Sequence, residues 1–261
     1  MTQKKTKARL YIADDLEEGM IVSPGPEQAH YLIRVMRLKP GDAVALFNGR
    51  DGEWFGIIES VTKKSCHLRI KDRMRQQSLE PNLWLAFAPL KKSRTDFLIE
   101  KATELGVARL IAVFTDHTDT ARVNTERLGQ IAIEAAEQCE RLSIPEISGP
   151  FKLQDLLADW PADRTLLVAD ETGGGKPIAQ VVALARNPRD ASGLSPQPAL
   201  GILIGPEGGY SQAELDLLAK LPFSVFVGLG PRILRAETAA LAALTCVQSQ
   251  VGDWNVLPRS G

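Results

Sequence analysis

Two segments that combine glycines with apolar and basic residues are the strongest candidates for chemistry in this sequence. Residues 204–211 and residues 228–238 each follow an apolar run of strand length. Open α/β sheets place their ligand sites at the carboxyl ends of strands. Three glycines and a proline in the first segment let bare backbone approach a flat ligand closely. Apolar residues flanked by two arginines in the second favour a partly apolar ligand beside an anionic substrate.

Other common catalytic motifs are missing from the chain. The Gly-rich segment 171–177 resembles a phosphate-binding loop only superficially, because Asp170 and Pro177 stand where that motif needs Gly and Ser or Thr. We therefore expect a flexible turn there. No G-x-S-x-G or G-x-G-x-x-G follows an apolar strand, so hydrolase and dinucleotide-binding signatures are absent.

Composition limits the classes of protein to consider. The 261 residues are 44% hydrophobic and 24% charged, which is typical of globular chains and excludes disordered and fibrous ones. The net charge is −1, but residues 1–78 carry 14 Lys and Arg against 10 Asp and Glu, so the amino-terminal third is basic. Three widely separated cysteines indicate neither a zinc site nor a disulfide framework. With no signal-peptide pattern and no apolar run of about 18 residues, we expect a cytoplasmic protein without metal or membrane partners.

The spacing of apolar residues divides the chain in two. Residues 20–70 predict short β-segments with turn signals, and the polar run 71–78 predicts a linker or a domain edge, with a boundary near 72–80. From residue 82 onward, strand-length apolar runs alternate with helical segments, which predicts an α/β fold with a mainly parallel sheet. The expected strands are 83–88, 110–114, 165–169, 200–204 and 223–227, and the expected helices include 93–105, 126–141 and 236–250; the Pro/Ser-rich stretch 186–199 is expected to be a surface loop.

The two loop segments carry a family resemblance. Residues 204–209 followed by 229–239 resemble the paired signature of the SPOUT superfamily of S-adenosylmethionine-dependent RNA methyltransferases, and are most similar to the RsmE family of 16S ribosomal RNA (uracil-N3)-methyltransferases. Further segments agree in order and spacing, at residues 9–11, 30–42, 101–106 and 134–141. The resemblance covers nearly the whole chain.

The resemblance implies a fold, a cofactor and a partner. It implies a PUA-like β-barrel over 1–74 that binds RNA, followed over 79–261 by an α/β methyltransferase domain with a trefoil knot. Ordinary connection rules would never suggest that knot. It also implies a homodimer, with S-adenosylmethionine held largely by backbone groups of the two loops. The cofactor-binding residues that it implies are Ile204, Gly205, Pro206, Glu207, Gly209, Leu229, Gly230, Ile233, Leu234 and Thr238.

The implied reaction makes demands on the remaining site residues. Methylation at N3 of a uridine requires loss of a weakly acidic ring proton, so the site must stabilise a developing uracil anion or supply a base. Arg235 is the first candidate for stabilising this anion or positioning a phosphate, unless it is a surface arginine neutralised by Glu237. Glu237 is a weaker catalytic candidate, because an acid in the first turn of a helix is stabilised by the helix dipole whatever its function.

Basic and polar residues are candidates for contacting RNA. The predicted RNA-binding residues are Arg9, Arg34, Arg37, Gln138, Arg141 and Arg232. Arginines of this kind contact phosphates, although solvated surface arginines are equally common. The chain departs from the family at His117, which stands after the second α/β strand where an arginine is usual, so a substrate role at this position is doubtful.

Three functional hypotheses follow. The leading one is a dimeric enzyme that methylates N3 of a uridine in 16S ribosomal RNA, within an assembled 30S subunit. The second is a non-catalytic RNA-binding or ribosome-assembly factor on the same fold, against which the intact glycines and arginines of both loops argue. The third is a SPOUT methyltransferase with another RNA target, such as a transfer RNA or a ribose hydroxyl.

Overall fold

A computed structural model describes residues 5–62, 65–78, 82–120, 122–170, 172–185 and 198–255. The chain forms two compact units, one comprising residues 1–79 and 133–144 and the other residues 80–132 and 145–261. The division predicted from the sequence at 74–79 places residues 133–144 with the second part. In the structure they pack in the first unit, because Arg9 donates to the backbone carbonyls of Ala136 and Arg141.

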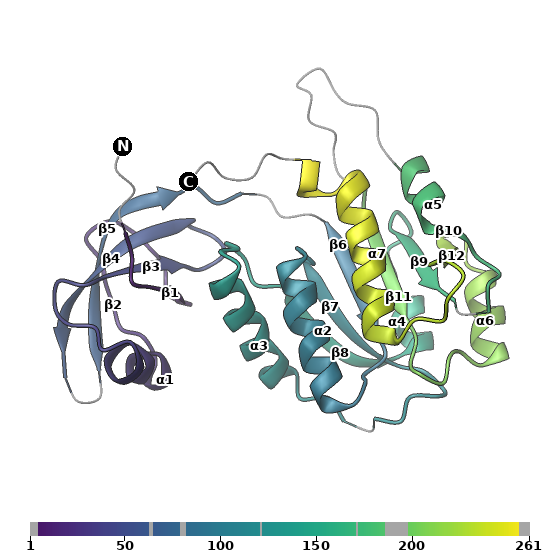
Figure 1. The fold of residues 1–261 in the computed structure, drawn as a ribbon, viewed down its shortest axis with the longest axis horizontal. Coiled ribbons are helices and arrows are strands. Elements are labelled where there is room, and N and C mark those ends of the chain that lie inside the picture. The colour runs from purple at the N-terminus through teal and green to yellow at the C-terminus, as the bar shows by residue number, and fades with distance from the viewer. Residues whose placement is uncertain are drawn as a thin grey trace, which may run out of the picture. The chain divides into compact units, whose positions relative to one another are not determined.

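The first unit is built on a five-stranded sheet (Figure 1). Its strands are β1 (Ala8–Tyr11), β2 (Ile21–Val22), β3 (Ala43–Phe47), β4 (Glu53–Val61) and β5 (Cys66–Arg75), in the order β1-β3-β4-β5-β2. Only β1 and β3 pair in parallel. A short helix α1 (Pro26–His30) continues into a π-helical turn at Tyr31–Val35. Apolar side chains from the strands and from α1 form one buried cluster, which includes Leu10, Leu32, Val44 and Leu68.

Of the two alternatives for 71–78, a linker is wrong for the first part of this run, because residues 71–75 belong to a strand. β5 continues to Arg75 and pairs Arg73 with Trp54 and Arg75 with Glu53. The polar composition misled the prediction, because this end of the strand is held by charged side chains rather than by apolar burial. Arg75 donates two hydrogen bonds to the Glu53 carboxylate, at 2.6 and 2.9 Å.

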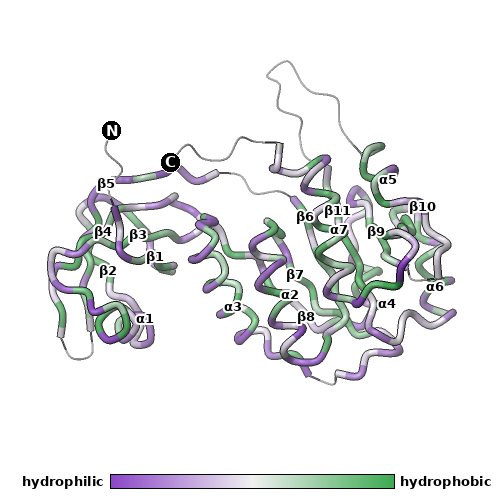
Figure 2. The backbone as a smooth tube through the Cα atoms, in the orientation of Figure 1, coloured by the Kyte–Doolittle hydropathy of each residue, from purple (hydrophilic) through white to green (hydrophobic). Residues whose placement is uncertain are grey.

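The second unit contains a seven-stranded, entirely parallel sheet. Its strands are β6 (Leu83–Phe87), β7 (Arg109–Phe114), β8 (Glu146–Lys152), β9 (Thr165–Ala169), β10 (Lys176–Pro177), β11 (Leu200–Ile204) and β12 (Ser224–Gly228), in the order β10-β12-β9-β11-β6-β7-β8. The parallel sheet and the five predicted strands are confirmed, while β8 and β10 were not predicted. The central strands β7 and β11 are mainly hydrophobic (Figure 2), as strands covered on both faces must be.

Helices connect the strands of this sheet. They are α2 (Lys92–Glu104), α3 (Thr125–Gln138), α4 (Leu153–Ala158), α5 (Ile178–Leu184), α6 (Gln212–Ala219) and α7 (Ala236–Val251). α3 continues into the residues that pack in the first unit. The three predicted helices are confirmed as α2, α3 and α7, although α3 ends three residues earlier than expected. Gly106 adopts the left-handed conformation predicted after α2, with φ of 79°. Ser211 and Glu214 form the predicted capping box at the start of α6.

Some sequence predictions concern parts of the chain that the structure does not describe or features that it does not settle. Residues 186–197 of the predicted surface loop lie outside the described residues. The trefoil knot stays a prediction. Within the described ranges, no helix has the length and apolar character needed to cross a membrane. The same residues contain no group of three or more His, Cys, Asp or Glu side chains that could hold a metal ion.

Candidate functional site

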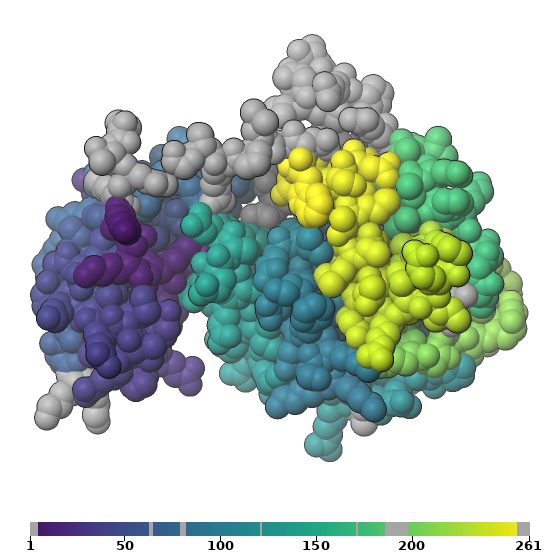
Figure 3. Space-filling view, in the orientation of Figure 1, coloured from purple at the N-terminus to yellow at the C-terminus, as the bar shows by residue number. Residues whose placement is uncertain are grey.

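A cavity of about 440 Å³ lies at the carboxyl ends of three strands of the parallel sheet. The lining includes Ala169 at the end of β9 and Asp170 directly after it, residues 204–207 at the end of β11 and in the following loop, and residues 228–235 at the end of β12 and in the following loop. This is where the two signature segments were expected to meet, and the volume suits a small organic ligand. The loop at 229–235 lies on the molecular surface beside α7, coloured yellow-green in Figure 3.

Most of the cofactor-binding candidates line this cavity. Those that do are Ile204, Gly205, Pro206, Glu207, Leu229, Gly230, Ile233 and Leu234. Gly209 and Thr238 are not among the lining residues. Gly209 closes the turn instead, with φ of 69° and a backbone hydrogen bond of 3.0 Å to the Pro206 carbonyl. Which of the lining residues bind the cofactor remains a prediction.

Gly205 has a steric reason for being glycine. A β-carbon at this position would lie 2.9 Å from the ring of Tyr210, whose side chain is buried in the apolar cluster beneath the loop. Any side chain at 205 would therefore displace either the loop or Tyr210. The close packing that fixes the loop also leaves bare backbone facing the cavity.

The sequence analysis missed the contribution of the loop after β9. Asp170 and Gly173 line the cavity, within the segment that was expected to be only a flexible turn. The Asp170 carboxylate accepts hydrogen bonds from the backbone nitrogen of Thr172, at 2.9 Å, and from its hydroxyl. The signal was available, because this segment also follows an apolar strand of the parallel sheet, and the rule applied to the other two loops covers it equally.

Arg235 stands at the edge of the cavity. It is the residue immediately before α7, it lines the cavity, and it is exposed. The sequence left open that Glu237 might neutralise it. The structure pairs Glu237 with Arg94 of α2 instead, with 3.7 Å between Arg94 Nε and Glu237 Oε1. Glu237 itself does not line the cavity.

The loop after β11 is attached to the loop after β7. The Ser211 hydroxyl donates to Asp116 at 2.6 Å, and the Asp116 backbone nitrogen donates to Glu214 at 2.9 Å. His117 Nδ1 lies 3.0 Å from the carbonyl oxygen of Gly208. His117 thus contacts the loop after β11, and the imidazole must donate because a carbonyl can only accept.

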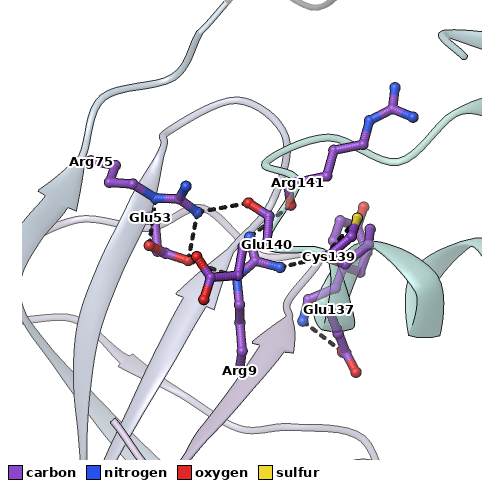
Figure 4. Close-up of polar contacts among 9 residues, drawn as sticks. Arg9, Glu53, Arg75, Glu137, Cys139, Glu140 and Arg141 are labelled. Atoms are coloured by element: carbon purple, nitrogen blue, oxygen red, sulfur yellow. Dashed lines mark hydrogen bonds and ion pairs between the residues drawn. The ribbon is translucent and has the colours of Figure 1, made fainter. Parts of the chain in front are cut away.

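Arg9 and Glu53 form the centre of a buried charged cluster in the first unit (Figure 4). Arg9 donates to the Glu53 carboxylate and to the carbonyls of Ala136 and Arg141, each at 2.6 Å, and its guanidinium lies over the Phe47 ring. Burial lowers the pKa of Arg9, but an arginine stays protonated at any ordinary pH. Burial alone would raise the pKa of Glu53, yet hydrogen bonds from Arg75 and Arg9 outweigh it and hold that pKa below its usual value.

The predicted RNA-binding residues differ in their exposure and in their hydrogen bonds. Because all the guanidinium nitrogens of Arg9 donate to protein groups, a phosphate would have to compete with these bonds, and RNA binding by Arg9 stays a prediction that this geometry does not favour. Arg141 is buried and bonds Ser143 at 3.1 Å. Figure 4 shows its guanidinium directed away from Glu53. The remaining candidates, Arg34, Arg37, Gln138 and Arg232, are exposed, and Arg232 also lines the cavity.

Comparisons with known proteins agree with these observations. Residues 77–248 match the RNA methyltransferase domain family, and residues 24–71 match the RNA methyltransferase PUA domain family. The chain is 35% identical over 241 residues to ribosomal RNA small subunit methyltransferase E of Rickettsia conorii, covering 92% of this chain and 94% of that protein. It is 31% identical to the Bacillus subtilis protein of the same name, covering 90% of this chain and 92% of that one.

A solved structure shares the fold. It is the crystal structure of a ribosomal RNA small subunit methyltransferase E from Neisseria gonorrhoeae bound to S-adenosylmethionine, with a TM-score of 0.82, 26% identity, and coverage of 95% of this chain and 99% of that one. The α/β methyltransferase fold with a PUA-like domain, which the resemblance implied, is confirmed. The chain belongs to the ribosomal RNA small subunit methyltransferase E family of RNA methyltransferases.

Proposed function

We propose that this protein transfers the methyl group of S-adenosylmethionine to N3 of a uridine in 16S ribosomal RNA, on the assembled 30S subunit. The observation that supports the proposal most directly is the cavity in which the two signature loops converge with Arg235 at its edge. Family membership supports the donor and the class of RNA. By the same resemblance, we propose that the enzyme acts in the cytoplasm as a homodimer.

The chemistry of the cavity fits S-adenosylmethionine. Leu229 and Leu234 offer an apolar surface for a flat adenine ring, and the glycine-rich backbone offers hydrogen-bonding groups for its edge. Asp170 is an acidic group on the cavity wall, which suits ribose hydroxyls or a positively charged amine. When bound, the cofactor supplies a methyl group on a positively charged sulfur.

The residues of this chain must then prepare the uridine. N3 lies on the base-pairing edge, so the base must be unpaired or flipped out before it can enter the site. Methyl transfer to N3 requires the N3 proton to pass to solvent water, and the negative charge of the resulting anion is shared with the neighbouring carbonyl oxygens. The exposed guanidinium of Arg235 can donate to such an oxygen and stabilise this charge in the transition state.

The test is methyl transfer from labelled S-adenosylmethionine to 30S subunits isolated from a strain that lacks the enzyme, followed by mass spectrometry of the digested nucleosides. We expect a new 3-methyluridine peak, with naked 16S RNA as the comparison for particle dependence. A different methylated nucleoside would show another RNA target. Cofactor binding without any transfer, to either the particle or the naked RNA, would favour a non-catalytic RNA-binding protein.

A further inference from the structure

Arg94 is the only residue that the described ion pairs connect to both signature segments, 204–211 and 228–238, which contain the two cofactor loops. Its Nη1 donates to Glu207 Oε1 at 2.9 Å, and its Nε lies 3.7 Å from Glu237 Oε1. Glu207 lies in the loop after β11 and lines the cavity, whereas Glu237 lies in the first turn of α7, directly after the loop from β12. One guanidinium therefore joins the two segments that enclose the cavity.

The hydrogen bonds of the sheet do not fix the distance between these two loops. Both β11 and β12 pair with β9, so they do not hydrogen-bond to each other. Two strand spacings separate them by about 10 Å. Beyond the carboxyl ends of the strands no ladder continues, so the two loops need a side-chain connection to hold a fixed distance. The long, planar guanidinium of an arginine can bond two carboxylates at once.

The start of α2 is electrostatically unfavourable on its own, which points to a role beyond helix stability. Lys91, Lys92 and Arg94 all lie at the amino-terminal end, and the first turn contains no acidic residue. Cations at this end oppose the helix dipole. The carboxylates of Glu207 and Glu237 provide compensating negative charge. The position of Arg94 is fixed by Thr95, whose hydroxyl hydrogen-bonds the backbone nitrogen and carbonyl of Leu90, each at 3.0 Å.

Glu237 depends on this connection. Its side chain is 14% exposed, and its Oε2 is buried without a hydrogen-bond partner among the described residues. Arg94 is the cation that contacts this carboxylate. Without Arg94, a largely buried carboxylate would lose its counter-charge, and such a group relaxes toward water. That movement would carry the first turn of α7 and the loop before it away from the cavity.

We infer that Arg94 is a positioning residue, which acts through Glu207 and Glu237 to hold the two cofactor loops at the spacing that binds S-adenosylmethionine. The inference rests on the proposed cofactor, and it adds a residue outside both signature segments. Arg94 does not itself line the cavity. Its loss should therefore affect cofactor affinity more than the rate of the chemical step.

The test measures the dissociation constant of S-adenosylmethionine by calorimetry for the full-length protein and for variants at both ends of the connection. We expect Arg94→Gln to weaken binding about tenfold, which corresponds to about 1.4 kcal/mol. Arg94→Lys, which keeps the charge, should stay within about threefold of the wild type. Lys92→Gln removes an exposed positive charge from the same turn and should leave binding unchanged.

A double-variant cycle distinguishes this role from a general loss of structure. If Arg94 acts through Glu207, the pair Arg94→Gln with Glu207→Gln should bind no more weakly than Arg94→Gln alone. At saturating cofactor, kcat of Arg94→Gln should fall less than threefold while KM for S-adenosylmethionine rises. Should Arg94→Gln fail to fold, Glu237→Gln tests the same connection, because Glu237 contacts Arg94 but does not line the cavity.

The outcomes separate this inference from the proposed function. Binding by Arg94→Gln within twofold of wild type, or equal losses for Arg94→Gln and Lys92→Gln, overturns the inference alone. A wild-type protein that binds the cofactor but forms no 3-methyluridine overturns the proposed substrate, while the binding data still decide the role of Arg94. A wild-type protein that does not bind S-adenosylmethionine overturns both.

Discussion

His117 Nδ1 and the carbonyl oxygen of Gly208 lie 3.0 Å apart, so His117 attaches the loop after β7 to the loop after β11. The contact is close, because a β-carbon at position 208 would lie 3.1 Å from the His117 β-carbon. The short imidazole side chain thus reaches the neighbouring backbone. An effect on cofactor binding is the first consequence to test.

His117→Ala should weaken S-adenosylmethionine binding about threefold to tenfold, because a typical net hydrogen bond contributes about 0.5–1.5 kcal/mol. Calorimetric titration of the variant and of the wild type with S-adenosylmethionine measures this loss. His67→Ala, which removes a histidine bonded to Ser23 in the first unit, is the matched control and should bind normally.

Arg235→Ala should lower kcat for methyl transfer by about 100-fold to 1000-fold, the usual loss when a group that stabilises transition-state charge is removed. Cofactor affinity should stay within twofold, since the loop backbone and Asp170 remain. Arg232→Ala, in the same loop, should instead raise KM for the RNA, because that arginine is a predicted RNA contact. Single-turnover kinetics separate the two variants. Full turnover by Arg235→Ala with bound cofactor would contradict the catalytic assignment.

The buried Glu53 predicts an acid-sensitive first unit. Its pKa is held below the usual value in the folded protein, so its stabilising effect is present above the ordinary carboxyl pKa and is lost as the pH falls through the lowered folded-state pKa. Glu53→Gln should cost about 3 kcal/mol at pH 7, because Arg9 and Arg75 lose their counter-charge. The variant should also show a weaker loss of stability on acidification than the wild type.

Urea unfolding at pH 7 and at pH 3.5 measures these effects. The control is Glu59→Gln, which removes the exposed carboxylate that pairs with Arg69. That change should cost less than about 1 kcal/mol, as exposed ion pairs usually do. An equal loss in the free energy of unfolding for the two variants would contradict the prediction, because it would show that the buried cluster stabilises the fold no more than an exposed ion pair.

The parallel sheet could be predicted from the sequence because its central strands are short, continuous apolar runs. β9 and β11 were predicted with the bounds that the structure shows, and burial on both faces explains why. β10 has only two residues and β8 alternates polar and apolar side chains without long apolar runs, so neither produces a clear pattern. The extension of β5 to Arg75 was not predicted for a different reason. Its charged side chains look like those of a loop in the sequence, but Arg75 pairs with Glu53 on the neighbouring strand β4.

The parts of the site that consist of glycine-rich and apolar loops could be predicted from the sequence. The contacts between side chains that are distant in the sequence could not. Glycines and apolar residues at 204–207 and 229–234 mark the cavity locally. The Arg94 and Glu207 pair joins residues 113 positions apart, and no local pattern contains such a contact. Arg9 is a similar case, because it was predicted as a barrel residue that contacts RNA phosphates, and no local pattern reveals that its hydrogen-bond partners lie 44 to 132 positions away.

The last prediction concerns Gly175, in the segment that was expected to be only a flexible turn. A β-carbon there would lie 2.6 Å from the backbone of Val227 in β12, which leaves no room for alanine. Gly175→Ala should therefore destabilise the second unit by more than about 1 kcal/mol, as overpacking does. It should also weaken cofactor binding, because Asp170 and Gly173 of the same loop line the cavity.

Gly129→Ala is the matched control for this change. Gly129 lies within α3, a β-carbon there would meet nothing within 4 Å, and alanine is the better helix former by about 1 kcal/mol. The control should therefore raise the free energy of unfolding while leaving cofactor binding unchanged. If the close approach to β12 requires glycine at position 175, thermal unfolding should show that Gly175→Ala lowers the free energy of unfolding and that Gly129→Ala raises it. Calorimetry should show weaker cofactor binding for Gly175→Ala alone. If Gly175→Ala is as stable as wild type and binds the cofactor equally well, the segment is a flexible turn after all.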